Sequence, residues 1–390
     1  MSSSTLTPVP SQPSSDPSSS SPAAPDKSGQ VGRRGDRIVA LDGLRFIAAF
    51  MVLLYHLAGR PTGGPSQAWG ESVTEVFPQL QKVAQFGWLG VEMFFIISGF
   101  AICMSAWGRS LGDFFRSRVV RVYPAYWAAV LITFTVVSIW PMMRGPVRFN
   151  DMLLNLTMLH EPLGVTAMDG VYWTLWAELK FYLLFALVVA KGLTYRRVVT
   201  FCCAWTVAAV VAVSVDNPLL TEIVQPSAAP FFIAGIALYM VRRFGSDFTL
   251  WGIVGVSWLI AQHHAVYFPH GNVKKNVDTE QAIAITVFVT LVFVVIGAIA
   301  VGRLSWIRWR ALTTAGLLTY PLYLLHQQIG WVLVYGLRRV LPTYVTLALV
   351  IAILLLAAYL VHRLVERPLS GRLRTALQHR PDPELDKTRR

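Results

Sequence analysis

The feature that most constrains this chain is a series of apolar blocks, each about as long as a membrane-crossing helix. A helix needs about 20 apolar residues to cross the hydrocarbon core of a bilayer. A span in lipid must also satisfy its own backbone hydrogen bonds, and the alternating ten-residue segments of a membrane β-barrel are absent. The sequence therefore predicts an all-α polytopic transmembrane helix bundle. Its ten predicted spans are residues 39–58, 86–107, 122–143, 171–190, 198–215, 226–241, 248–266, 281–302, 312–335 and 343–362.

Composition excludes several other classes of protein. Only 14% of the 390 residues are charged and 54% are hydrophobic, whereas soluble domains average about 25% charged residues. The net charge of +13 comes from basic residues that lie between the apolar blocks, not along one face, so it does not indicate nucleic-acid binding. The three cysteines all fall inside apolar blocks, a placement that supports neither a disulfide framework nor a metal site.

Charge distribution predicts the orientation of the bundle. Residues 1–37 form a predicted disordered tail, with 11 Ser and 6 Pro among the first 30 residues. If this tail is cytoplasmic, the cytoplasmic segments hold 24 basic residues and the opposite connections hold eight, a strong positive-inside bias. We therefore predict a multi-pass protein of the cell membrane with both termini cytoplasmic. Residues 38–368 form its membrane domain, and residues 369–390 form a basic cytoplasmic tail.

Ionisable side chains inside the spans are candidate functional groups, because each costs roughly 2.5–3.5 kcal/mol at the centre of an inserting helix. Rise per residue predicts that four of them share one depth in the outer half of the membrane. Arg45 is predicted in the inner half, near the level of Arg118 and Arg121. The four at the shared depth are His56, Glu92, Glu178 and His326; the others are Asp42, Arg45 and Lys180, with Glu366 at the end of the last span.

Arg45 and His56 are eleven residues apart, close to three helical turns, so both are expected on one face of the first span. This helix would then present a cation near the cytoplasm and an imidazole near the outside, which suits a reaction with one substrate entering from each side. Taken singly, each residue also fits a structural role. His56 would serve as an interhelical hydrogen-bond partner, Arg45 as an ion-pair partner of Asp42, and Arg118 as a topology signal.

Six segments, in order, resemble the acyltransferase-3 family of integral membrane acyltransferases. The resemblance covers most of residues 38–368. The segments are Arg45 with His56; Gly90–Phe100; Arg118, Arg121 and Pro124; Trp173–Glu178 with Phe181 and Tyr182; Tyr320, Tyr323 and His326; and Glu366 with Pro368. The resemblance implies transfer of an acyl group from cytoplasmic acyl-CoA to a hydroxyl on a sugar-bearing acceptor. It implies no permanently bound cofactor, only acyl-CoA as co-substrate.

The residues agree with this chemistry. A thioester is already activated, so the enzyme mainly has to deprotonate a hydroxyl and stabilise an oxyanion. His56 is the predicted general base, with Glu178 or Glu92 to orient it; the alternative role for His56 is that of nucleophile. Arg45, Arg118 and Arg121 are predicted to bind the CoA phosphates. His326 is predicted to donate to the carbonyl or the acceptor, and the remaining predicted substrate contacts are Ser98, Trp173, Tyr320 and Tyr323.

Two questions stay open at the level of sequence. A transporter or flippase for a lipid or hydrophobic product would also use a polar cavity, although the internal repeat typical of many transporters is absent. The acceptor is either a glycosylated secondary metabolite, such as a macrolide antibiotic, or a cell-surface glycan, and the length of the acyl chain is not determined.

Overall fold

A computed structural model describes residues 1, 38–143, 145, 147–215, 217–267 and 277–378. This part of the chain contains α-helices, short π- and 3-10 helices and no β-strand, so the predicted all-α class is confirmed. Residues 1–37 and 38–390 are separate units, and the helix bundle belongs to the second. The predicted tail 1–37, except for Met1, and the end of the chain from residue 379 lie outside the described residues.

The first half of the bundle contains both long and short helices. The long helices are α1 (Val39–Leu54, continued by the π-helix η1, Tyr55–Gly59), α5 (Leu89–Ala106), α6 (Leu111–Ile139), α8 (Trp173–Ala190, after the 3-10 helix η2, Gly170–Tyr172) and α9 (Tyr195–Val215). The short helices are α2 (Gly64–Trp69), α3 (Val73–Val76), α4 (Leu80–Ala84), α7 (Phe149–Leu156) and α10 (Pro218–Val224).

The second half consists mainly of long helices. They are α11 (Ala229–Phe244), α12 (Phe248–Tyr267), α13 (Thr279–Ala300), α14 (Arg310–Leu325), α15 (Gln328–Leu337) and α16 (Thr343–Val361). The π-helix η3 (His362–Glu366) leads from α16 into α17 (Arg367–Gln378). The predicted boundary of the membrane domain at residue 368 therefore falls just inside α17.

Eight of the ten predicted spans correspond to segments that are long and apolar enough to cross a membrane. The other two differ in ways that the sequence explains. The predicted span 248–266 is the 20-residue helix α12, whose second half contains Gln262, His263 and His264. The predicted span 312–335 is interrupted at His326 and Gln327, which separate α14 from α15. Helix α6 also begins at Leu111, eleven residues before the predicted span.

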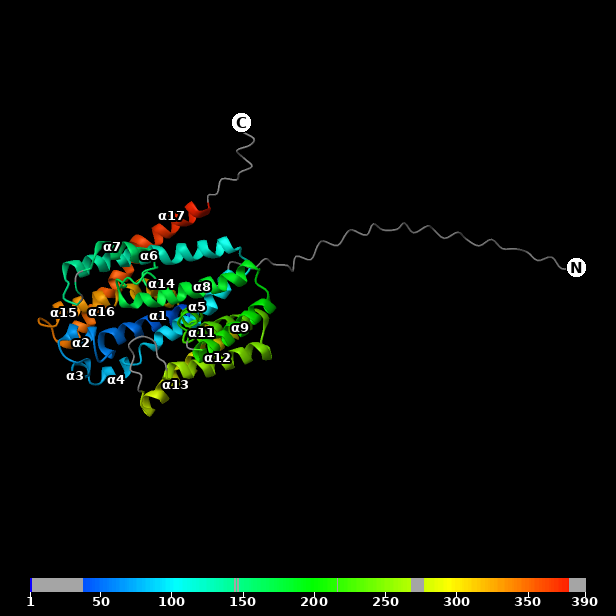
Figure 1. The fold of residues 1–390 in the computed structure, drawn as a ribbon, viewed down its shortest axis with the longest axis horizontal. Helices are drawn as coiled ribbons and strands as arrows, with labels where there is room; N and C mark the ends of the chain where they lie inside the picture. The colour runs from blue at the N-terminus through cyan, green and yellow to red at the C-terminus, as the bar shows by residue number, and fades with distance from the viewer. Residues whose placement is uncertain (2–37, 144, 146, 216, 268–276, 379–390) are drawn as a thin grey trace, which may run out of the picture. The chain divides into compact units, whose positions relative to one another are not determined.

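Helix α5 lies inside the bundle and packs closely on α1 and α11 (Figure 1). Two glycines of α5 make these contacts possible. A Cβ on Gly90 would lie 2.5 Å from the carbonyl oxygen of Ala48 in α1. A Cβ on Gly99 would lie 2.2 Å from the carbonyl oxygen of Phe232 in α11. Small residues thus bring the backbones together, as in other membrane bundles, where tight packing takes the place of a hydrophobic driving force.

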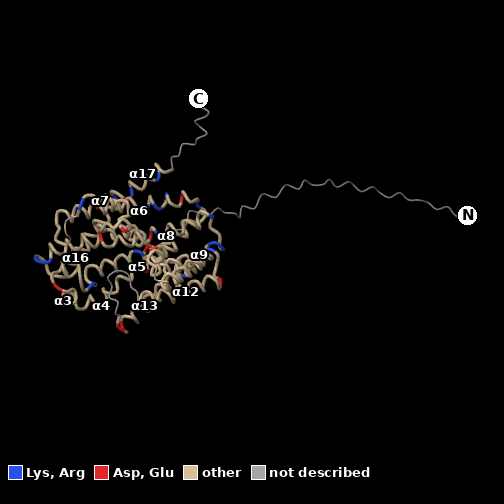
Figure 2. The backbone as a smooth tube through the Cα atoms, viewed as in Figure 1, with Lys and Arg blue, Asp and Glu red and all other residues tan. Residues whose placement is uncertain are grey.

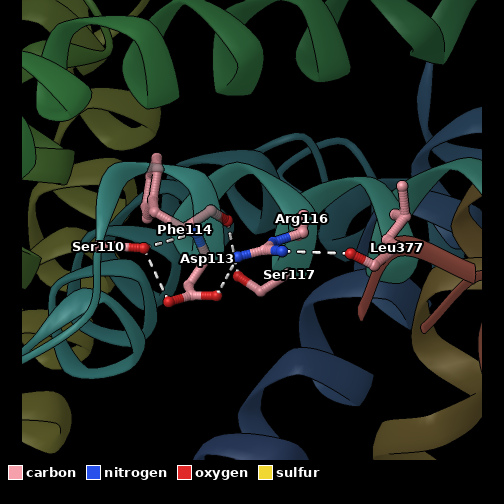
Figure 3. A network of polar contacts seen from close by, with 6 residues as sticks. All are labelled: Ser110, Asp113, Phe114, Arg116, Ser117 and Leu377. Atoms are coloured by element: carbon pink, nitrogen blue, oxygen red, sulfur yellow. Dashed lines mark hydrogen bonds and ion pairs between the residues drawn. The ribbon is translucent and has the colours of Figure 1, made fainter. Parts of the chain in front are cut away.

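Helix α17 packs along the first half of α6 (Figure 1). Pro124 has no N–H and so leaves the carbonyl oxygen of Val120 without its helical donor; the Ser370 hydroxyl of α17 donates to that oxygen at 3.0 Å. Nearer the start of α6, Arg116 bonds both the Asp113 carboxylate at 2.6 Å and the carbonyl oxygen of Leu377 at 3.1 Å (Figure 3). These contacts attach the last described helix to the helix that carries two candidate arginines.

Charged residues lie mainly at helix ends and in loops (Figure 2). Most residues between them are uncharged. A few charged residues of both signs lie inside the bundle near α5 and α8 (Figure 2). Because an ionised side chain inside a membrane bundle is costly unless it is paired or faces a cavity, these internal positions mark where the site is to be found.

Candidate functional site

His56 lies in the irregular end of the first span. Helix α1 changes to a π-helix at Tyr55, and such π-turns often occur at functional sites. The His56 ring is half-buried, and its Nδ1 lies 2.9 Å from the carbonyl oxygen of Val52. The indole N–H of Trp331 in α15 donates to the His56 carbonyl oxygen at 2.8 Å. Both the ring and the backbone of His56 are therefore held in place.

His326 lies at the break between α14 and α15 and meets His56 at the end of the neighbouring first span. Its Nε2 is 3.0 Å from Nδ1 of His56, and the two ring centroids are 5.0 Å apart. Its Nδ1 is 2.7 Å from the carbonyl oxygen of Tyr323, one turn earlier. The His326 side chain has no exposed surface. Two histidines that are 270 residues apart in sequence thus form one hydrogen-bonded pair.

A buried carboxylate holds the helix break in place. Asp169, just before η2, accepts hydrogen bonds from the backbone N–H groups of Val171 at 3.2 Å and Gln328 at 3.0 Å. It therefore caps the start of α15 from a distant loop, where a carboxylate is favoured by the helix dipole. The Gly170 backbone passes so close that an added Cβ would lie 2.6 Å from the Gln327 side chain. Asp169 was not among the predicted site residues.

A cavity of about 120 Å³ with both charged and apolar lining residues lies between α1, α5, α6, α8 and α14. Seven of the predicted site residues line it: Arg45, Ser98, Arg118, Arg121, Glu178, Tyr320 and Tyr323. Its apolar walls include Phe94, Phe95 and Ile102 of α5. Three guanidinium groups and one carboxylate face this space, so its charge favours an anion.

The three arginines are held to different degrees. Arg118 donates from Nε to the Ser117 hydroxyl at 3.2 Å and from Nη2 to the Ser105 hydroxyl of α5 at 3.0 Å. Its guanidinium also lies 5.9 Å from the centre of the Tyr182 ring. Arg45 forms an ion pair with Asp42 at 3.4 Å. Arg121 donates no hydrogen bond to the described residues, so its donors are available to a ligand.

The acidic residues lie in different surroundings from those that the sequence predicted. Glu178 accepts a hydrogen bond from the Ser98 hydroxyl at 2.8 Å and shares the cavity with the arginines. Glu92 is 3% exposed in α5 and is not among the described residues that line the cavity. The ring hydrogen bonds of His56 run to Val52 and His326. The predicted pairing of His56 with Glu178 or Glu92 is therefore not what this structure contains.

Tyr323 connects the cavity with the histidine pair. Its ring lines the cavity, and its centroid is 5.5 Å from the rings of both Phe94 and His326. Its hydroxyl lies 2.9 Å from the Thr174 hydroxyl of α8. Tyr320, one turn earlier, donates to the carbonyl oxygen of Val122 in α6 at 3.1 Å. The arginine cavity and the His56–His326 pair are thus adjacent parts of one site.

The remaining predicted residues lie around this centre. Trp173 packs edge to face on Phe95, with ring centroids 6.3 Å apart, and is not among the described residues that line the cavity. Lys180 forms an ion pair with Glu222 of α10 at 2.7 Å. Glu366 bonds Nδ1 of His362 at 2.8 Å within η3. Lys180 and Glu366 thus have local partners and lie outside the cavity lining.

Several residues of the site were not predicted from the sequence. Ser105 and Ser117 hold Arg118, Thr174 holds Tyr323, and Trp331 holds the backbone of His56. Thr174 lies within the Trp173–Glu178 segment, so the motif was a usable signal. Serines within apolar helices are common, and only the facing helix reveals their partner.

Comparisons with known proteins agree with the six motifs. The family model described as acyltransferase domain (Acyl_transf_3) matches residues 38–362. Acyltransferase MdmB of Streptomyces mycarofaciens is 27% identical over 400 residues, which covers 90% of this chain and 96% of that protein. No solved structure matches the chain. The predicted resemblance to this family is therefore confirmed.

Proposed function

Because this chain belongs to the acyltransferase family defined by that domain, we propose that it moves an acetyl or other short acyl group from acyl-CoA to a sugar hydroxyl. The acceptor is either a glycosylated metabolite such as a macrolide or a cell-surface glycan. The observation that carries the proposal is that the two groups of predicted site residues are adjacent, although neither histidine is among the described residues that line the cavity. The cavity lined by three arginines meets the His56–His326 pair through Tyr323.

The arginines suit the phosphate groups of CoA. Guanidinium groups bind phosphate oxygens through charge-assisted and often bidentate hydrogen bonds. Arg121 has its donors available, and Arg118 is held against two serines and so is already oriented. Free CoA carries several negative charges, and a cavity with three cations and one carboxylate attracts such a molecule.

His56 suits the deprotonation of the acceptor. In the proposed step the acceptor hydroxyl oxygen attacks the thioester carbonyl carbon, while the imidazole of His56 takes the hydroxyl proton. The C–S bond then breaks, and the proton passes from His56 to the CoA sulfur as the thiol leaves. The alternative is transfer through an acyl-imidazole, in which a ring nitrogen of His56 is the nucleophile instead of the base.

The test uses membranes that contain the wild-type protein or His56→Ala, supplied with radiolabelled acetyl-CoA or propionyl-CoA. The acceptors are a glycosylated macrolide and a cell-envelope glycan, each assayed separately. We expect label in one acceptor with the wild type, and a loss of at least about 10²-fold with His56→Ala, as for removal of a general base. Equal labelling by the two proteins would contradict the role of His56.

Exposed His263 of α12 provides the matched control for this experiment. His263→Ala should transfer label at the wild-type rate, which excludes a general effect of losing a histidine. Release of CoA without label in either acceptor, at a rate dependent on His56, would support thioester cleavage and exclude both acceptors. No CoA release at all would contradict transfer from acyl-CoA to either of these acceptors and would favour the transporter alternative.

A further inference from the structure

The hydrogen bonds around His326 determine which of its nitrogens carries the proton. Its Nδ1 lies 2.7 Å from the carbonyl oxygen of Tyr323. A carbonyl oxygen only accepts, so Nδ1 of His326 must donate. A neutral imidazole has a single ring proton. The Nε2 of neutral His326 therefore carries a lone pair and acts as an acceptor.

This acceptor in turn determines the tautomer of His56. The atom that faces Nε2 of His326 at 3.0 Å is Nδ1 of His56. Nδ1 of His56 also lies 2.9 Å from the carbonyl oxygen of Val52, a second acceptor. With an acceptor on both sides, Nδ1 of His56 carries the proton and shares it between them. The Nε2 of neutral His56 is then left with its lone pair.

Exposure separates the roles of the two rings. The His326 side chain is fully buried, and both of its nitrogens are engaged within the protein. The His56 ring is half-buried, and its Nε2 has no hydrogen-bond partner among the described residues. Of the two histidines, only His56 therefore has exposed surface and a ring nitrogen without a partner among the described residues, so we infer that His326 acts through His56. This differs from the sequence prediction that His326 donates directly to the carbonyl or the acceptor.

We propose that His326 is a positioning residue that fixes His56 in the Nδ1–H tautomer and so presents Nε2 of His56 as the reacting nitrogen. This inference rests on the proposed acyl transfer for its catalytic meaning. The hydrogen-bond chain runs from His56 Nδ1–H to His326 Nε2, and from His326 Nδ1–H to the carbonyl oxygen of Tyr323. When Nε2 of His56 takes the acceptor proton, Nδ1 keeps its own proton and its bond to His326.

The arrangement resembles a catalytic triad in which the third group is the neutral imidazole of His326 instead of a carboxylate. In a Ser-His-Asp triad a carboxylate holds the imidazole in the tautomer that leaves the other nitrogen free to act as the base. Here a second imidazole, oriented by a backbone carbonyl, performs that task. Because Tyr323 lines the arginine cavity as well, its position links substrate binding to the orientation of His326.

The first test reads the tautomer directly and needs no activity. The full-length protein is labelled with ¹⁵N-histidine, reconstituted in liposomes and studied by solid-state NMR at a pH where both rings are neutral. The signals of His56 are identified by their loss in His56→Gln. We expect the wild type to show a protonated Nδ1 and an unprotonated Nε2 for His56, with coupling from that Nδ1–H to His326. A protonated Nε2 on His56 would overturn the proposal.

The second test compares two replacements of His326 in acyl transfer from acetyl-CoA. Glutamine has an oxygen that can accept from His56 and an amide N–H that can donate to Tyr323, whereas leucine has neither. We expect His326→Leu to lower kcat by roughly 10²- to 10⁴-fold, as for loss of a base or of its tautomer in other enzymes. The KM for acetyl-CoA should stay within about threefold, and His326→Gln should recover much of the lost kcat.

His263→Gln in the exposed part of α12 is the matched control and should retain wild-type kinetics. Equal losses of kcat in His326→Gln and His326→Leu, with His56 still protonated on Nδ1 in both, would overturn the positioning role. A wild-type protein that transfers no acyl group would contradict the proposed function, and the NMR spectrum would still decide the tautomer. The two proposals therefore fail in different ways.

Discussion

At the scale of single residues, the site combines cations that are already held with one that is not. A buried guanidinium without hydrogen-bond partners is costly, because its lost hydration is not replaced. Arg118 recovers part of this cost through Ser105 and Ser117, and Arg45 through Asp42. Arg121 is exposed and has no such partner among the described residues. Arg121 is therefore the cation for which a bound phosphate would provide the most new hydrogen bonding.

We expect Arg121→Ala to raise the KM for acetyl-CoA more than it lowers kcat. Loss of a hydrogen bond to a charged group costs about 1.5–3 kcal/mol, and each 1.4 kcal/mol corresponds to about tenfold in affinity. The KM for acetyl-CoA should thus rise about 10- to 100-fold, with a smaller change in kcat. Initial rates over a range of acetyl-CoA concentrations measure both constants.

Arg116 provides the control, since it lies on the same helix but bonds Asp113 and the carbonyl oxygen of Leu377 (Figure 3). Arg116→Ala removes the same charge from α6 without touching the cavity lining. It should leave the KM for acetyl-CoA within about twofold, because exposed ion pairs contribute about 0–1 kcal/mol. Equal increases in KM for the two variants would show that only the overall charge matters, which contradicts a specific phosphate contact by Arg121.

The sequence identified the chemical groups of the site better than their pairing. Seven of the eleven predicted site residues line the cavity, and His56 meets His326. The predicted Glu–His pair does not occur, because depth along a helix leaves open the direction in which a side chain points. His56 lies in the π-turn that begins at Tyr55, and His326 lies in the break after Leu325, so regular helix geometry does not give the direction of either side chain. Both irregularities depend on contacts between distant segments.

At the scale of helices, close backbone contacts position the residues that line the cavity. Ser98, which donates to Glu178, is followed by Gly99, whose Cα faces the backbone of Phe232 in α11. Gly235 of α11 makes a second close contact with α5, since a Cβ there would lie 2.0 Å from the carbonyl oxygen of Ile96. The glycines thus set the distance between α5 and α11, and with it the place of Ser98 in the cavity.

We expect Gly99→Ala to destabilise the protein although alanine favours helices. Its Cβ would lie 2.2 Å from the Phe232 carbonyl oxygen, a backbone atom that cannot rotate away. Overpacking of this kind typically costs about 1–3 kcal/mol. Thermal unfolding of the purified protein in detergent should show a lower midpoint for Gly99→Ala than for the wild type.

Gly255 in α12 is the matched control, because an added Cβ there meets no atom within 4 Å. Gly255→Ala should keep or raise the midpoint, since alanine in an open helical position gains about 0.5–1 kcal/mol over glycine. A midpoint for Gly99→Ala equal to that for Gly255→Ala would mean that α5 and α11 separate at little cost. The close contact would then not determine the position of Ser98.

The sequence predicts a helix boundary where hydrophobicity determines it. It does not predict a boundary that depends on charged residues or on packing against another helix. The first turns of α6 carry Asp113, Arg116, Arg118 and Arg121, which a membrane span does not favour, so the predicted span began at residue 122. In the structure Ser110 caps this helix by accepting from the backbone N–H of Asp113 at 3.1 Å, and α17 packs beside it. A capped and supported helix tolerates charges that lie before its apolar part.

At the scale of the whole molecule, the number of crossings depends on α12 and on the α14–α15 pair. Both lie outside the eight segments that length and apolarity identify. However, α12 packs along α11 and α13, and its 20 residues extend about 30 Å, enough to cross the hydrocarbon core. Helix α14 packs along α1, and α15 continues beside α16. These contacts favour ten crossings, because each helix runs beside neighbours that are long and apolar enough to cross.

The loop at residues 301–309, between α13 and α14, distinguishes ten crossings from eight. With a cytoplasmic N-terminus and ten crossings this loop faces the cytoplasm, in agreement with its Arg303 and Arg308. If neither α12 nor the α14–α15 pair crosses, the loop faces outside, while both termini stay cytoplasmic. A reporter at residue 390 would read the same in both arrangements, so the test has to be made within the chain.

We therefore expect Ser305→Cys, an exposed position of this loop, to be protected from a membrane-impermeant maleimide in intact cells. Cys103, Cys202 and Cys203 are first replaced by serine or alanine, and transfer activity or thermal unfolding shows that the background is folded. Ser305→Cys should react only after the membrane is opened. Thr74→Cys, exposed in α3 between the first two spans, should react in intact cells and show that the reagent reaches the outer face. Reaction at both positions in intact cells would exclude ten crossings. It would mean that neither α12 nor the α14–α15 pair crosses the membrane.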